Sequence, residues 1–162
     1  MKATSKDKQL TGAAGEHLVL SRLLTREMLA SQAPRGTREA DILVNPLDGG
    51  RPVLIQVKTR SARSGELSWL MSSKNELISE TDLFYCLVNL EPINPSVYVV
   101  PSKIVAKVIT QVHAEWLATP GKNGKKQKDS DTRQLKNNYG PNFKTVKPGR
   151  MDKYLENWDQ LD

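Results

Sequence analysis

The sequence predicts an α/β fold in which helices flank a mixed central sheet. Two segments carry apolar side chains at helical spacing: residues 11–32, and a segment that begins at Ser102 and repeats apolar residues up to Trp116. Between them, turn residues separate five stretches with the pattern of strands: 39–45, 53–59, 66–72, 81–90 and 96–100. This order of elements is typical of a sheet whose faces are covered by helices.

The helix boundaries follow from capping and breaking residues. Thr11 is the expected N-cap of the first helix, and Pro34 with Gly36 is expected to end it. Ser102 is the expected N-cap of the second helix.

The stretches 39–45 and 53–59 predict a hairpin, because the turn sequence PLDGG lies between them. If the turn is centred between Asn45 and Pro52, the numbers of facing residues add up to about 97. Asp41 then lies opposite Gln56, with Lys58 on the diagonal. A slip of one residue would turn these side chains to opposite faces.

The chain of 162 residues is long enough for one domain with its own core. We expect residues 1–119 to form the α/β core, and residues 120–162 to add a basic loop and a C-terminal extension to the same domain. Residues 151–161 are expected to form a short closing helix, or a strand-like tail docked by Tyr154 and Trp158.

The composition indicates a cytoplasmic protein without a membrane segment. No apolar run approaches the ~18–20 residues that span a bilayer, and the polar start MKATSKDKQLTG does not resemble a signal peptide. The single cysteine, Cys86, lies in an apolar run and is expected to be buried and reduced. A disulfide framework and a cysteine-ligated zinc site are therefore excluded.

Positive charge is concentrated near the C-terminus. Residues 120–150 hold nine basic and two acidic side chains, a surplus of seven in a chain with a net charge of +6. A polyanion is the natural partner of such a block, and a solvated loop is the alternative. The basic residues expected to contact nucleic acid are Lys122, Lys125, Lys126, Lys128, Arg133 and Lys136. Trp69 and Tyr139 are candidates for stacking on bases, with packing as the alternative for each.

Glu16 is an acid on an apolar helix face. At about 100° per residue, it falls among Val19, Leu20 and Leu23. A carboxylate there is costly unless it is paired or lies at the edge of the core. An acid near a helix N-terminus is also favourable without any further role, and Glu27 falls on the same stripe.

Together, these residues form a candidate site for hydrolysing phosphodiesters. Asp41, the Gln56 side-chain oxygen and the Val57 carbonyl are hard oxygen ligands of the kind that Mg²⁺ or Mn²⁺ prefers. Glu16 would hold a water molecule beside the metal. Lys58 would position that water or stabilise charge on the phosphate.

These segments resemble the PD-(D/E)xK nuclease superfamily, which has the restriction-endonuclease-like fold. GEHLVLSRLL, ADILV and LIQVKTR match its helix glutamate (Glu16), its metal-binding aspartate (Asp41) and its lysine (Lys58). The resemblance implies an αβββαβ core and a DNA endonuclease of restriction, homing or junction-resolving type. Gln56 takes the place of the second acid, as in certain intron-encoded homing endonucleases, and Ala40 replaces the proline.

The same resemblance implies a homodimer or higher homo-oligomer, because two sites are needed to cut both strands, and no organic cofactor. Two alternatives are a catalytically inactive nucleic-acid-binding module with the same fold, and a protein-interaction accessory domain. Other chemistries find no motif: the two histidines, His17 and His113, do not make a metal site, and neither a G-x-S-x-G elbow nor a phosphate loop is present.

Overall fold

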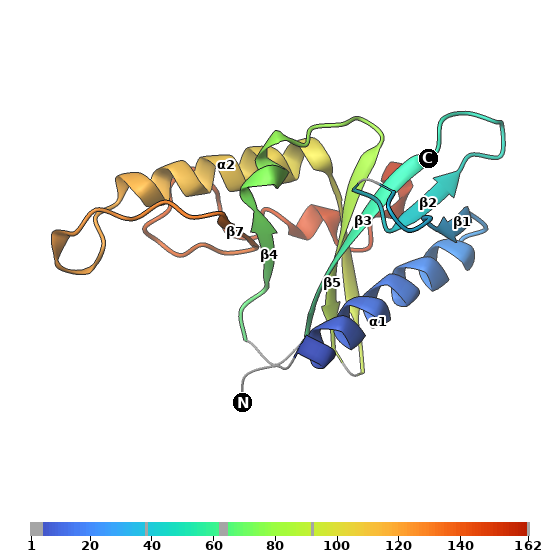
Figure 1. Ribbon diagram of the computed structural model, residues 1–162, viewed down its shortest axis with the longest axis horizontal. Helices are drawn as coiled ribbons and strands as arrows, with labels where there is room; N and C mark the ends of the chain where they lie inside the picture. Colours follow the sequence, from blue (N-terminus) through green and yellow to red (C-terminus); the bar gives the residue numbers. More distant parts are fainter. Residues whose placement is uncertain (1–4, 38, 62–64, 92, 162) are drawn as a thin grey trace.

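A five-stranded mixed sheet forms the centre of the protein (Figure 1). The computed structural model describes residues 5–37, 39–61, 65–91 and 93–161. The strands of the sheet, in spatial order, are β1 (Leu29–Gln32), β2 (Ile42–Asn45), β3 (Val53–Ser61), β5 (Leu83–Leu90) and β6 (Ser96–Pro101). Among these strands only the β3–β5 pair is parallel, so the sheet is mixed, as predicted.

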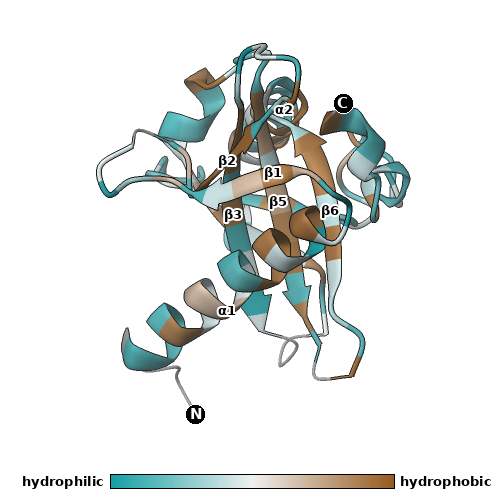
Figure 2. Ribbon diagram, turned by 90° about the vertical axis from the view of Figure 1, so that its right-hand side faces the viewer, coloured by the Kyte–Doolittle hydropathy of each residue, from teal (hydrophilic) through white to brown (hydrophobic). Residues whose placement is uncertain are grey.

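One helix packs on each face of the sheet, which confirms the predicted fold class. α1 (Ser5–Leu24) packs its buried Val19 and Leu23 against Ile55 and Val57 of β3. α2 (Ser102–Ala118) packs over the opposite face with its own apolar cluster. Figure 2 shows α1 crossing the strands, with its apolar residues concentrated in the half that lies on the sheet. Neither helix is long and apolar enough to cross a membrane, within the residues described.

A second, two-stranded sheet extends the α2 side of the molecule. β4 (Ser68–Ser72) pairs antiparallel with β7 (Thr132–Lys136), so the strand predicted at 66–72 exists but lies outside the central sheet. A 3-10 turn (Ser73–Leu77) follows β4 and leads to β5. β7 lies in the basic block and was not predicted. Its Leu135 is fully buried in the α2 cluster, and this packing holds a polar sequence in a strand.

The prediction of one helix over residues 11–32 was wrong at both ends. The helix begins at Ser5, so Thr11 lies inside it, and the Thr11 hydroxyl donates to the Asp7 carbonyl at 2.7 Å. The helix ends at Leu24, well before Pro34. Glu27 adopts a positive φ of 62°, and the chain turns there into β1. The apolar residues of the short edge strand β1 happen to continue the helical spacing of α1. Periodicity alone therefore does not reveal where the helix ends.

The remaining elements lie close to their predicted positions. The strand predicted from residue 39 begins at Ile42, and the helix predicted at Ser102 begins there. Ser102 is the first helical residue rather than the N-cap, and its hydroxyl donates to the Glu80 carbonyl at 2.7 Å.

The C-terminal tail packs back on the sheet. It forms two 3-10 turns, Asp152–Tyr154 and Trp158–Leu161. Tyr154 packs in the α2 cluster and Trp158 in the α1 cluster, as the docking hypothesis required.

Candidate functional site

The predicted hairpin register is the one observed. Ile42 pairs with Ile55, Leu43 with Leu54, and Val44 with Val53, so facing residue numbers add up to 97. Beyond Ile42 the regular pairing stops. The Asp41 backbone N–H donates to the Ile55 carbonyl at 2.8 Å, and Asp41 Oδ2 accepts the Val57 backbone N–H at 2.7 Å. The aspartate side chain thus takes the place of a backbone partner at the edge of β3.

The Val57 carbonyl points to the β2 side of β3, the side on which the Val57 N–H binds Asp41. The Leu54 N–H donates to the Asp82 carbonyl on the β5 side of β3, whereas the Ile55 carbonyl accepts from Asp41 on the β2 side. Backbone polar groups alternate between the two sides along a strand, so those of Val57 point to the β2 side, as those of Ile55 do. The Val57 N–H is bound by Asp41, and its carbonyl opens on the same edge.

Gln56 and Lys58 lie on the sheet face covered by α2. They pair in register with Tyr85 and Leu87, which belong to the α2 cluster. Both side chains are half-buried. Gln56 Oε1 is buried and accepts no hydrogen bond from the residues described, and Lys58 forms no ion pair with any of them. An unpartnered buried carbonyl beside a carboxylate has the chemistry of a cation ligand.

Glu16 approaches the site from α1. Burial raises the pKa of the Glu16 carboxyl above its usual value, and the negative charge of Asp41 raises it further, partly offset by His17. The two negative charges of Glu16 and Asp41 therefore repel each other. A bound cation would relieve this repulsion.

Gly15 positions Glu16 and was missed at the sequence level. A Cβ on Gly15 would lie 1.8 Å from Thr59 Oγ1, so only glycine allows α1 to approach β3 this closely. Thr59 Oγ1 is buried and unpartnered among the residues described. The available signal was a glycine within a helical pattern, directly before the acid.

The donor set suits a hard divalent cation. No group of three His, Cys, Asp or Glu side chains that could hold a metal occurs in the described part of the chain. The available ligands are instead two carboxylates, the Gln56 amide oxygen and the Val57 carbonyl. All are oxygen ligands, as Mg²⁺ and Mn²⁺ prefer, and the orphaned Gln56 Oε1 fits such an ion.

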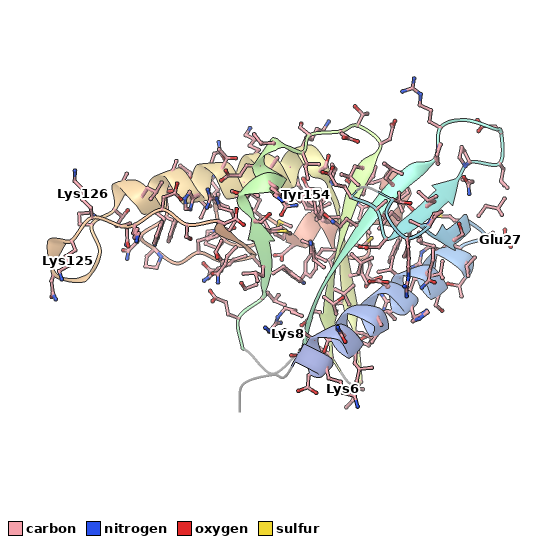
Figure 3. The ribbon with its side chains drawn as sticks, viewed as in Figure 1. Lys6, Lys8, Glu27, Lys125, Lys126 and Tyr154 are labelled. Atoms are coloured by element: carbon pink, nitrogen blue, oxygen red, sulfur yellow. The ribbon has the colours of Figure 1, made fainter. Side chains whose placement is uncertain are left out.

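The basic residues of the 120–150 block do not form one surface. Lys125, Lys126 and Lys128 are exposed, and Figure 3 shows Lys125 and Lys126 projecting from the tip of a loop far from β2. Lys136 is half-buried, with Nζ 3.0 Å from Glu66. The Lys122 side chain lies outside the described residues.

Arg133 is not available to contact a phosphate. Its side chain is only 6% exposed, and its Nε lies 2.6 Å from Glu76 Oε1. It also donates to the carbonyls of Ser130 and Thr132. The guanidinium that the sequence predicts to contact nucleic acid is thus used within the protein in this structure. Composition does not distinguish Arg133 from the exposed lysines of the same block. Only the pairing of β7 directs its side chain inward.

The structure also locates four residues that were considered at the level of the sequence: Trp69, Tyr139, His113 and Cys86. Trp69 is buried and donates Nε1–H to the Val88 carbonyl at 2.9 Å, so it is a core residue. Tyr139 is half-buried and lines a groove beside α2. His113 lies 2.7 Å from Asp129, and Cys86 is buried, as expected.

Comparison with solved structures finds a known protein with a similar fold. The structure of a bacterial homing endonuclease, I-Ssp6803I, matches with a TM-score of 0.50, over 94% of this chain and 90% of that chain, at 14% sequence identity. No protein-family model and no curated protein matches the sequence. At this identity the likeness establishes the fold: the chain has the mixed α/β architecture of this endonuclease.

Proposed function

We propose that the protein is a divalent-metal-dependent DNA endonuclease, a Q-x-K variant of the PD-(D/E)xK superfamily. The proposal rests on one observation above all. Asp41 Oδ2 binds the Val57 N–H at the edge of β3, between Gln56 and Lys58 in sequence, where β2 stops pairing. The shared fold with a homing endonuclease supports it.

The proposed ligands of Mg²⁺ or Mn²⁺ are Asp41, Gln56 Oε1 and the Val57 carbonyl, with Glu16 beside them. When bound, the ion would supply Lewis-acid activation of the phosphate and of water. The Asp41 carboxylate is held in place through Oδ2 by the Val57 N–H, and its Oδ1 forms no hydrogen bond with the residues described. Gln56 adds an oxygen without a formal charge, so metal affinity depends mainly on Asp41 and Glu16.

Glu16 and Lys58 are proposed to act on the reacting groups. Glu16 orients a water molecule and accepts its proton as the water oxygen attacks phosphorus. One P–O ester bond breaks, and the leaving oxygen takes up a proton from solvent, which gives a phosphate monoester and a hydroxyl group. Glu16 then returns its proton to solvent. Lys58 donates hydrogen bonds to the phosphate oxygens as negative charge develops. Its ammonium is suited to this role because no carboxylate of the described residues lies within ion-pair distance.

DNA is the proposed substrate because the exposed lysines of the 120–150 block supply positive charge for phosphates. We assign this role to the exposed Lys125, Lys126 and Lys128, and we extend it to Lys122 and to the half-buried Lys136, whose partner Glu66 is exposed. Arg133 is left out. We also propose that residues 120–162 belong to the same domain as the core. Cutting both strands requires two copies of the site, so a homodimer or higher homo-oligomer is part of the proposal.

Plasmid cleavage tests the catalytic role. Purified protein is incubated with supercoiled plasmid in Mg²⁺, Mn²⁺ or EDTA, and nicked and linear products are measured. We expect metal-dependent cleavage, lowered by about 10²–10⁴-fold in Lys58→Ala and Asp41→Ala. Lys103→Ala and Asp159→Ala remove exposed side chains of the same types elsewhere and are expected to cleave normally. Absence of cleavage with either ion, or normal cleavage by the two site variants, would contradict the proposal.

Gln56 favours one alternative: a DNA-binding module that has lost catalysis. It replaces a carboxylate by a neutral amide and so weakens the cation site. Calorimetric titration with Mn²⁺ separates the two functions. An inactive binder would hold DNA in a salt-dependent manner but release no heat with Mn²⁺, whereas a nuclease requires a metal site that disappears in Asp41→Ala.

A further inference from the structure

A groove of about 400 Å³ separates α2 from the segment 130–143. Such a volume falls in the ~300–1,000 Å³ range of small-molecule sites. The α2 wall presents His113 and Trp116 above the buried Ile109 and Val112. Tyr139 and Phe143 line it from the opposite side. Figure 1 shows α2 and β7 extending away from α1, so the groove is distinct from the Asp41 site.

The groove is built from flat, fixed rings. His113 stacks on Trp116, with ring centroids 5.5 Å apart and planes at 26°. Tyr139 and Phe143 form a second pair with centroids 5.6 Å apart. Two hydrogen bonds fix the Tyr139 hydroxyl. It accepts the Lys136 backbone N–H at 3.0 Å and donates to the Gln134 carbonyl at 3.0 Å. These rings lose little conformational freedom when a planar ligand binds.

Positive charge lies on the loop that leads into the groove wall at Ser130. The loop that joins α2 to β7 carries the exposed Lys125, Lys126 and Lys128, which form no ion pair with the residues described. Two acids that adjoin lining residues in the sequence, Asp129 and Glu115, already have partners. Asp129 binds His113, and the hydrogen bond from His113 holds the Asp129 pKa below its usual value.

Glu115, on the same helix, accepts the backbone N–H groups of Lys144 and Thr145. Aromatic rings and uncharged polar groups, such as Gln134 and Thr132, therefore line the groove, and the unpaired ammonium groups lie on the loop beside it. Arg133 and Lys136, which also line the groove, are paired with Glu76 and Glu66.

We propose that this groove binds unpaired nucleotides of DNA. The bases would stack on the ring pairs, while the lysines of the loop hold the phosphates on either side. The inference rests on the proposed function in that DNA is the substrate, and it narrows the substrate to DNA with a single-stranded segment, such as a flap, gap or branch. A blunt duplex would use the lysines but not the rings.

Tryptophan fluorescence measures this directly. The chain has three tryptophans, and Trp69 and Trp158 are only 1% and 2% exposed, so Trp116 is the one a base can reach. Single-stranded dT12, titrated in EDTA to prevent cleavage, is expected to quench the fluorescence of the protein. A blunt 12-bp duplex at equal strand concentration is expected to quench it little. Trp116→Phe should abolish the quenching while retaining affinity.

Affinity is measured by anisotropy with labelled dT12 and with labelled duplex. Trp116→Ala and Phe143→Ala change opposite walls and are each expected to weaken dT12 binding about 5- to 100-fold, with duplex binding unchanged. Leu117→Ala removes an exposed apolar side chain outside the groove and is the matched control. Phe143→Ala keeps the test valid if Trp116→Ala does not fold.

The outcomes distinguish this inference from the proposed function. If the protein binds and cuts duplex DNA but dT12 neither quenches Trp116 nor binds more weakly to the two variants, the groove inference fails and the nuclease proposal stands. If neither DNA form binds at low salt, both fail. Self-association that is lost in Trp116→Ala, measured by sedimentation, would assign the groove to a second copy of the chain and overturn the inference.

Discussion

Gly15 of α1 lies against Thr59 of β3 so closely that a Cβ on Gly15 would be 1.8 Å from Thr59 Oγ1 and 2.9 Å from its Cβ. This contact sets the height of α1 above the sheet and, through the next residue, the position of Glu16.

Gly15→Ala is expected to lower the free energy of unfolding by about 1–3 kcal/mol, because neither the helix nor the β-branched threonine can move without disturbing the core. Chemical denaturation measures it. Gly12→Ala, on the same helix with nothing within 4 Å, is the control and is expected to stabilise by about 0.5–1 kcal/mol. Equal stabilisation by both variants would show that the close approach does not exist.

Glu16→Gln is expected to stabilise the metal-free protein slightly at pH 7, by less than about 1 kcal/mol because the side chain is partly exposed. Burial and Asp41 raise the pKa of Glu16, so the folded state holds this proton more tightly than the unfolded state. The unfavourable contribution of Glu16 therefore decreases as pH falls from neutral through the raised pKa, and the gain of the variant vanishes below about pH 4.5.

Thermal melts from pH 4 to 8 measure this difference, with exposed Glu27→Gln as the control. Added Mn²⁺ should stabilise the wild type more than Glu16→Gln. A gain that persists unchanged at pH 4 would rule out the electrostatic cause.

Gln56→Glu is expected to tighten Mn²⁺ binding at least about tenfold, because it adds a formal charge to the ligands. It is also expected to lower the stability of the metal-free protein, since a third carboxylate would be half-buried near Asp41. Calorimetry measures the affinity, and Gln32→Glu on β1, which is exposed, is the matched control. Unchanged affinity would mean that residue 56 is not a ligand.

Glu156 anchors the C-terminal tail. Its carboxylate accepts hydrogen bonds from Arg22, from the Val97 backbone N–H and from Trp158 Nε1. Glu156→Gln is expected to lower the free energy of unfolding by about 1–3 kcal/mol at pH 7. Burial alone would raise the pKa of Glu156, but the hydrogen bonds outweigh it and lower the pKa.

The contribution of Glu156 is therefore complete above its ordinary pKa of 4.5 and is lost as pH falls through the lower folded value. Urea unfolding at pH 7 and at pH 3 should show the difference between wild type and variant shrinking. A difference that is constant with pH would contradict the role of the charge. Glu91→Gln, on the loop that follows β5, serves as the control.

The sequence predicted much of the central sheet because the information is local. Alternation identifies β3, and the turn sequence before it specifies the register with β2, so the residues alone place Asp41 opposite Gln56. The helical start of α2 at Ser102 followed from the same kind of local pattern. The end of α1 at Leu24 could not be predicted in this way. Met28 and Leu29 continue the apolar spacing, although the chain turns at Glu27.

Local patterns in the sequence by itself thus determined β2, β3, β5 and β6, the faces of the β2–β3 hairpin and the order Glu16, Asp41, Gln56, Lys58, but neither β1 nor β7. Only the tertiary structure decided which charges remain available. Arg133 and Lys125 belong to one basic block, yet β7 pairs with β4 and turns Arg133 onto Glu76, while the loop leaves Lys125 exposed. The close approach of Gly15 to Thr59, and the groove between α2 and Tyr139, were likewise beyond prediction. Each depends on contacts between residues far apart in the chain, which packing of the whole core selects and local pattern does not encode.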